Sequence, residues 1–267
     1  MKILVLSPHR GDAAFSLAVS MGKWLAAGHR VTILNVFSRS LYAPFSDAEF
    51  VHENDRLSYV SAMRRREDEH FVQQMVNDLP KAARANLLMV DLNLKDAPLR
   101  LRCALEDVSD LAVNPEDPAI GKLRKTLDRL VAAREMDALV LPLGLGEHVD
   151  HLTVRDAALP LTTELPSTFY EDMPYAATHP SVATDLQALR EETGTKWHEE
   201  LRAVLNRRAD LGDEWKRRLI LGYASQIDDD EAARMGEFAA RYSGGERLWA
   251  NQRWLAIAES CRLSSPA

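Results

Sequence analysis

The sequence has few cysteines and lacks any long run of apolar or basic residues. Its 267 residues include two cysteines, Cys103 and Cys261, which lie far apart and outside any C-x-x-C pattern. A disulfide framework is therefore not expected, and reduced thiols point to a cytoplasmic protein. No segment approaches the roughly 18 apolar residues of a membrane span, and the apolar run at the N-terminus is too short for a signal peptide. These absences predict a cytoplasmic protein without a membrane association.

The charge balance argues against a nucleic-acid partner. The formal net charge is -7, and no basic stripe of the kind that binds a phosphate backbone is present. The sequence also contains no G-x-G-x-x-G pattern and no Walker loop, so no motif supports a nucleotide ligand. An apolar content of 46% is ordinary for a globular protein. We therefore expect a folded chain that acts on a small molecule. The chain could form a homo-oligomer.

Apolar runs that alternate with amphipathic segments predict an α/β fold. Residues 2–7 and 29–37 have the pattern of strands, and the helix between them should begin at Asp12 as N-cap and stop at Gly28. Further strands are expected at 86–94, at 137–145 and from 167, and further helices at 61–79, at 121–136 and after 148. The last third of the chain has mostly helical patterns, and 91–118 is expected to be a long loop that forms a lid or an insertion. The alternation predicts a mainly parallel sheet with helices on both faces.

Two of the predicted strands end in residues that bind metals. His9 and Asp12 follow the first strand, and the segment GEHVDHLT, with His148 and His151, follows the strand at 137–145. In open α/β sheets the ligand lies beyond the carboxyl ends of the strands. Residues three apart share a face in a tight turn or a first helical turn. Three such ligands with a fourth position left open are typical of a catalytic zinc site.

Each of these residues also has a plain structural interpretation. His9 alone is more often a loop histidine that has its hydrogen bonds satisfied, and Asp12 alone is most often a helix N-cap. The segment HVDH alone could be a surface turn. Since both pairs come directly after an apolar strand, a metal site is the better hypothesis for the two together.

The quoted segments resemble the PIG-L/LmbE-like family of zinc-dependent N-acetylglucosamine deacetylases. That family begins with a strand that ends in P-H-x-D-D and later carries H-x-D-H; the matching segments here are PHRGD (8–12) and HVDH (148–151). Weaker similarities are AAGHRVTILNVFS, RRREDE (64–69), DAPLR (96–100), FYEDMPYA (169–176) and YASQI (223–227). The resemblance implies a Rossmann-like fold over a single domain, residues 1–267, with a mostly helical region from about residue 185.

The resemblance also implies roles for particular residues. The zinc ligands would be His9, Asp12 and His151, while His148 would stabilise the developing oxyanion. The carboxylate of Asp150 would orient a neighbouring histidine. Arg64 would match an arginine that contacts the substrate. A position on a solvated helix face is an equal alternative for this residue. If the side chain of Arg10 points into the pocket, it would bind an anionic group of the substrate.

The chain departs from the family at the position of the general base. The first aspartate of P-H-x-D-D takes the proton from the metal-bound water, and here that position is Gly11. A positioned general base contributes about 10²–10⁴-fold to a rate. A substitute carboxylate could come from Glu147, Asp150, Glu171 or Asp172, or glycine could leave room for a larger substrate. The sequence thus predicts a metal-dependent hydrolase, most simply an N-deacetylase of an amino sugar. The alternative is a noncatalytic metal- or sugar-binding protein derived from the same family.

Overall fold

The computed structural model describes residues 1–179, 182–202 and 213–263. Seven strands form one sheet in the order β3-β2-β1-β4-β5-β7-β6. The strands are β1 (Lys2–Ser7), β2 (Arg30–Asn35), β3 (Leu87–Asp91), β4 (Ala138–Pro142), β5 (Ser167–Tyr170), β6 (His198–Arg202) and β7 (Glu246–Ala250). The first five pair in parallel, whereas β7 is antiparallel to β5 and to β6. The predicted α/β class with a mainly parallel sheet is confirmed.

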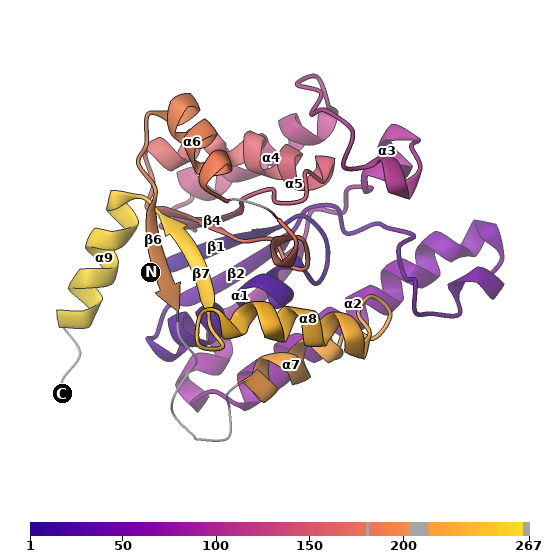
Figure 1. Cartoon of the computed structure of the whole chain (residues 1–267), viewed down its shortest axis with the longest axis horizontal. Coiled ribbons are helices and arrows are strands. Elements are labelled where there is room, and N and C mark those ends of the chain that lie inside the picture. Colours follow the sequence, from indigo (N-terminus) through magenta and orange to yellow (C-terminus); the bar gives the residue numbers. More distant parts are fainter. Residues whose placement is uncertain (180–181, 203–212, 264–267) are drawn as a thin grey trace.

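The helices cover both faces of the sheet (Figure 1). They are α1 (Asp12–Ala26), α2 (Glu53–Asn77), α3 (Ala97–Leu101), α4 (Pro118–Ala132), α5 (Val149–Ala158), α6 (Val182–Thr193), α7 (Asp213–Leu221), α8 (Asp229–Ala240) and α9 (Gln252–Leu263). On one side lie α4, α5 and α6, and on the other α1, α2, α7 and α8. Because both faces are covered, every residue of β4 is buried, and only the first residue of β1 is not. None of the described helices is long and apolar enough to span a membrane.

The prediction for the C-terminal third was incomplete. Strands β6 and β7 lie in the part of the chain that was expected to be mostly helical, and α6 to α9 supply the helices. The sequence of β6, HEELR, carries charges because this strand forms an edge of the sheet, where charged side chains prevent further pairing. Its apolar signal is therefore too weak to be recognised. The predicted lid at 91–118 contains the short helix α3, and the single-domain boundaries stay a prediction.

Helix α1 begins one residue earlier than expected. Gly11 is its N-cap, and Asp12, predicted as the cap, is the first helical residue. The carboxylate of Asp12 instead accepts a hydrogen bond from the backbone N–H of His9 at 2.7 Å. Gly11 has φ of 97°, a backbone conformation that L side chains rarely adopt, and this allows the sharp turn between β1 and α1. Helix α2 begins at Glu53, well before the predicted residue 61, and its amino-terminal end projects from the body (Figure 1).

Candidate metal centre

Three side chains from three adjoining segments meet beyond the carboxyl ends of the central strands. His9 follows β1, Asp12 begins α1, and His151 lies in the first turn of α5. Oδ2 of Asp12 lies 3.3 Å from Nδ1 of His9 and 3.3 Å from Nε2 of His151. Ligand atoms of a tetrahedral zinc ion, each about 2.0–2.2 Å from the metal, lie roughly 3.3–3.6 Å apart. The spacing of these three atoms therefore fits one divalent ion with an open coordination position.

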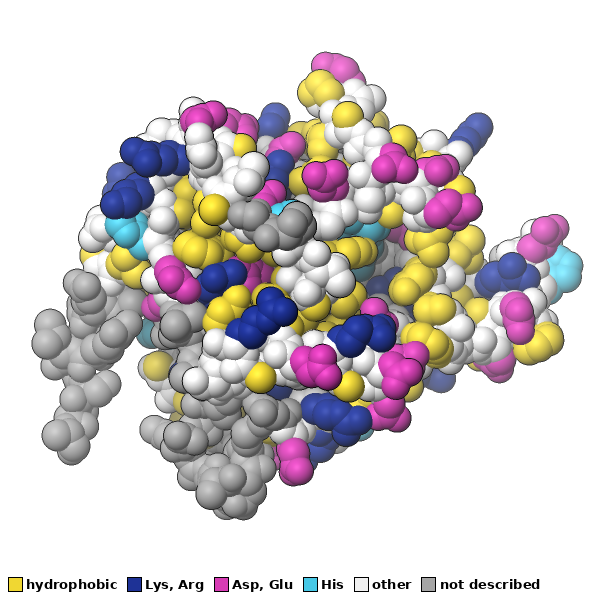
Figure 2. All heavy atoms as spheres, in the orientation of Figure 1, with side chains coloured by type: hydrophobic (Ala, Val, Ile, Leu, Met, Phe, Trp, Pro, Cys, Tyr) yellow, Lys and Arg dark blue, Asp and Glu magenta, His cyan; other side chains and the backbone are white. Residues whose placement is uncertain are grey.

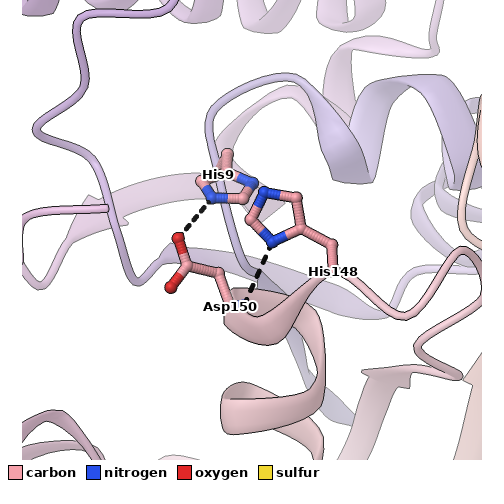
Figure 3. A group of neighbouring side chains, drawn as sticks. All are labelled: His9, His148 and Asp150. Carbon is pink, nitrogen blue, oxygen red and sulfur yellow. Dashed lines mark hydrogen bonds and ion pairs between the residues drawn. The ribbon is translucent and has the colours of Figure 1, made fainter. Parts of the chain in front are cut away.

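The far nitrogen of each histidine is held by a carboxylate. Nε2 of His9 lies 2.9 Å from Oδ2 of Asp150, and Nδ1 of His151 lies 2.6 Å from Oδ1 of Asp172. In metal sites such carboxylates fix the tautomer and the orientation of the ligand ring. The contact between His9 and Asp150 is drawn in Figure 3. The donor set and its outer contacts together fit a divalent metal.

A second group of possible ligands consists of His9, His148 and Asp150. The carboxylate of Asp150, however, already accepts hydrogen bonds from the backbone N–H of Ala97 and from Nη1 of Arg100, each at 2.8 Å. Its remaining contact is the one with His9. Because these bonds occupy both oxygens of Asp150, the group formed by His9, Asp12 and His151 is the better metal site.

His148 occupies the N-cap of α5 and faces the cavity. Its Nδ1 accepts a hydrogen bond from the backbone N–H of Asp150 at 3.1 Å, as drawn in Figure 3. This bond places the proton of the neutral ring on Nε2. Burial, with repulsion from His9 and His151, lowers the pKa of His148 to about 3. The ring is therefore neutral near pH 7 and can donate a hydrogen bond from Nε2.

The buried charges of the centre hold one another in their ionised forms. Burial alone would lower the pKa of His151, but Asp12 and Asp172 outweigh it and raise this pKa to about 10. Burial would likewise raise the pKa of Asp12, yet the attraction of His151 and His9 lowers it well below its ordinary value. In the metal-free chain these two carboxylates therefore favour a protonated, positively charged His151.

A cavity of about 340 Å³ opens above the centre. Its walls come from the loops after β1, β2, β3, β4 and β5, from α1, α2 and α3, and from the start of α8 with the turn that precedes it. The lining residues are His9, Asp12, Phe15, Ser40, Tyr42, Arg64, Asp96, Pro98, Leu105, Glu106, Val108, Ser109, His148, Pro174, Tyr175, Gln226, Ile227 and Glu231. His151 lies beneath this surface with 1% of its area exposed. The cavity combines the candidate ligands with a set of polar and aromatic side chains.

The two predicted substrate arginines differ in position. Arg64 lines the cavity, and Nη2 of this residue donates to the backbone oxygen of Arg10 at 2.8 Å. The buried Nε of Arg64 has no hydrogen-bond partner among the described residues. Arg10 does not line the cavity: its guanidinium forms ion pairs with Asp68 and Asp91, each at 2.5 Å. The condition for the predicted substrate contact of Arg10 is therefore not met, because its guanidinium pairs with two carboxylates outside the cavity lining.

The space beside Gly11 is not empty. A Cβ atom at position 11 would lie 2.8 Å from the ring of Phe15, so this ring fills the place of a side chain. None of the four suggested substitute carboxylates lines the cavity. Glu147 is exposed, Glu171 is held by Arg247 and Trp249, and Asp150 and Asp172 hold the ligand histidines.

Besides Asp12, the carboxylates that line the cavity are Asp96, Glu106 and Glu231, which were not among the residues predicted from the sequence. Asp96 is 4% exposed and caps α3 through a bond from the backbone N–H of Leu99 to Oδ1 at 3.3 Å. The sequence D-A-P at 96–98 is an N-cap followed by a proline in the first turn, and it therefore carried a local signal. The other two carboxylates had no recognisable sequence signal.

The fold and the centre define an α/β protein with a candidate metal site, and the known proteins it resembles are deacetylases. No family model matches the chain. It is similar to 2'-N-acetylparomamine deacetylase of Streptomyces fradiae, with 29% identity over 261 residues, covering 93% of this chain and 81% of the relative. A solved structure of the zinc-inhibited form of teicoplanin deacetylase Orf2 matches with a TM-score of 0.67 and 21% identity, covering 94% of this chain and 98% of that one.

A more distant structure has the same fold. N,N'-diacetylchitobiose deacetylase from Pyrococcus horikoshii matches with a TM-score of 0.58 and 15% identity, covering 95% of this chain and 84% of that one. At these identities the solved structures establish the fold. Together with the curated relative, they confirm the predicted resemblance to the PIG-L/LmbE-like deacetylases, and they support an enzyme of this type.

Proposed function

We propose that this chain removes the N-acyl group of an amino sugar and uses a divalent metal, most simply zinc, held by His9, Asp12 and His151. The observation that carries the proposal is that Oδ2 of Asp12 lies 3.3 Å from a ring nitrogen of His9 and 3.3 Å from one of His151, with a carboxylate behind each histidine. When bound, zinc would supply a Lewis acid and a water of lowered pKa. The deacetylase relatives give the reaction class.

The remaining residues of the centre have distinct tasks in such a reaction. His148 is neutral and carries its proton on Nε2, so it can donate a hydrogen bond to an oxyanion that develops on the amide carbonyl. Asp150 and Asp172 keep the two ligand rings oriented. The guanidinium of Arg64, in the cavity wall, places a positive charge where a polar group of the substrate would lie.

The proton acceptor must differ from that of the family. Gly11 has no side chain, and Phe15 occupies the adjacent space. Apart from the metal ligand Asp12, the carboxylates of the cavity wall are Asp96, Glu106 and Glu231, and these are the groups that could accept a proton at the cavity surface. The same observation favours the alternative function, a noncatalytic protein that binds a metal and an amino sugar.

The test measures metal content and amine release together. The purified protein, loaded with zinc, is assayed on a panel of N-acetylated amino sugars beside the variants His151→Gln and His148→Gln. We expect His151→Gln to lose metal and activity. The matched variant His148→Gln, one helical turn away, should keep the metal and lose about 10²–10³-fold in kcat. A zinc-loaded protein that binds these sugars without releasing amine from any of them would support the noncatalytic alternative.

A further inference from the structure

We propose that Asp68 is a positioning residue of the metal centre, which holds the turn between β1 and α1 through the side chain of Arg10. Asp68 lies on α2, is 2% exposed and does not line the cavity. The inference rests on the metal site of the proposed function and adds a residue that lies behind the ligands. It comes from a buried cluster of charged and polar side chains on the α2 side of this turn.

The turn between β1 and α1 carries a candidate ligand on each side of Arg10. His9 precedes this residue directly, and Asp12 follows it two positions later. The guanidinium of Arg10 is held by two carboxylates: Nη1 lies 2.5 Å from Oδ2 of Asp68, and Nη2 lies 2.5 Å from Oδ2 of Asp91. Because residue 10 is part of the same short turn as both ligands, fixing its side chain restricts the positions that the two ligands can take.

The cluster around Arg10 is shielded from water. On the face shown in Figure 2, acidic and basic side chains lie interspersed at the surface, where an ion pair contributes little. The side chains of Arg10 and Asp68 are only 5% and 2% exposed. Nδ2 of Asn35, the last residue of β2, donates to Oδ2 of Asp68 at 3.0 Å and to Oδ1 of Asp91 at 3.3 Å. Such a buried pair is costly to break, because the loss of one member leaves the other charge uncompensated.

Helix α2 holds residue 10 at two points. Arg64 and Asp68 are four positions apart on this helix and therefore share a face. Nη2 of Arg64 donates to the backbone oxygen of Arg10 at 2.8 Å, while Asp68 accepts from the guanidinium of Arg10. One face of α2 thus fixes both the main chain and the side chain of the residue that separates the ligands.

The other oxygen of Asp68 connects the turn to the cavity wall. Oδ1 accepts a hydrogen bond from the hydroxyl of Tyr223 at 2.9 Å. The ring of Tyr223 packs edge to face on the ring of Phe15, with 5.1 Å between the centroids, and Phe15 lines the cavity. The two oxygens of Asp68 therefore have separate tasks, and a variant of Tyr223 can separate them.

The test measures zinc affinity by competition with a chelator, in the absence of substrate. Burial raises the pKa of Asp68 to about 6, so the group is mostly ionised near pH 7.5 and Asp68→Asn removes a charge while it keeps the shape. We expect Asp68→Asn to weaken zinc binding by about tenfold, the lower end of the range for a group that orients a metal ligand through another residue. Tyr223→Phe removes only the hydrogen bond to Oδ1 and should leave zinc affinity unchanged.

Glu246→Gln is the matched control for the loss of a buried charge. Glu246 is 5% exposed and pairs with Lys216 at 2.7 Å, away from the turn. Both Asp68→Asn and Glu246→Gln should lower the melting temperature, but only the first should weaken zinc binding. If Asp68→Asn does not fold, Arg10→Lys takes its place, since lysine keeps the charge but cannot pair with both carboxylates through a planar fork.

The outcomes separate this inference from the proposed function. Wild-type zinc affinity in Asp68→Asn, or in Arg10→Lys where that variant is used, would overturn the positioning role. Equal weakening in Glu246→Gln would also overturn it, because general loss of stability would then be the cause. A protein that binds zinc with an affinity that depends on Asp68, yet releases no amine from any N-acetyl sugar, would contradict the deacetylase function and support the positioning role.

Discussion

The ring of Phe15 stands where a side chain at position 11 would project. A Cβ added to Gly11 would lie 2.8 Å from Cζ of Phe15, closer than real Cβ contacts allow. The two positions are four residues apart at the start of α1 and therefore share a face of the helix. The space that a side chain at position 11 would need is thus occupied by the ring of Phe15.

Restoring the aspartate at position 11 requires a second substitution. Gly11→Asp alone should lower stability by about 1–3 kcal/mol, because position 11 has φ of 97° and its side chain would collide with Phe15. The double variant Gly11→Asp/Phe15→Ala should gain up to 10²–10⁴-fold in deacetylation, the contribution of a general base. Thermal unfolding and kcat, with Phe15→Ala as the control, measure both effects. A folded, zinc-loaded double variant that is no faster than Phe15→Ala would show that the base is not the missing element.

The carboxylate of Asp172 should control metal affinity without binding the metal. Asp172→Asn weakens the bond that orients His151, and the loss of such a partner costs about 10–100-fold in metal affinity. The adjacent residue supplies the control: Glu171→Gln disturbs the pair with Arg247 and leaves the centre intact. Competition with a chelator measures both variants. Equal metal affinity in the two would contradict the role given to Asp172.

Arg64 should contribute to substrate binding more than its exposed neighbour. Arg64→Lys removes a guanidinium of the cavity wall, together with its hydrogen bonds to the backbone oxygen of Arg10 and to Oε1 of Gln226. It should raise KM for an N-acetyl amino sugar by roughly tenfold, since a hydrogen bond to a charged group is worth about 1.5–3 kcal/mol. Arg65→Lys changes the side chain at 65, which is 66% exposed and pairs with Glu69, and should leave KM unchanged. Circular dichroism shows whether both variants fold. A change in melting temperature without a change in KM would make Arg64 purely structural.

The metal-free chain should lose stability as the pH rises from about 6.5 towards 10. Asp12 and Asp172 outweigh burial and raise the pKa of His151 to about 10, so its stabilising charge is complete below the ordinary pKa and is lost as the pH rises through 10. Metal affinity should show the opposite trend, because His151 must release its proton to bind. Melting temperatures at pH 6, 7.5 and 9 are measured with chelator and with excess zinc. The comparison separates the pH dependence of the metal-free stability from that of metal binding. If the melting temperature changed with pH in the same way with chelator and with zinc, His151 would not be a metal ligand.

Much of the centre was predictable because its signals are local. An apolar strand followed by His9 and Asp12, and another followed by His148 and His151, can be recognised in single segments, and parallel strands bring their carboxyl ends to one edge. The direction of Arg10 could not be predicted, because it depends on Asp68 of α2 and Asp91 at the end of β3. The cavity carboxylates and the strands β6 and β7 depend likewise on contacts between distant segments.

The position of Phe15 is an intermediate case. Its spacing of four residues from Gly11 was visible in the sequence, but the spacing alone does not show which way the ring turns. The glycine at position 11 predicted a substitute carboxylate or room for a larger substrate, and the ring of Phe15 occupies the adjacent space instead.

Asp150 joins the metal centre to the segment that forms one wall of the cavity. One of its oxygens contacts both the ring of His9 and the N–H of Ala97 at the start of α3, and the other contacts Arg100. If α3 moved away from Asp150, the carboxylate that contacts His9 would change its surroundings. If a metal ion bound to His9, the hydrogen bonds between Asp150 and α3 would change in turn. The two effects are equal by thermodynamic linkage: the free energy by which packing of α3 against Asp150 strengthens metal binding is the same as the free energy by which metal binding stabilises that packing.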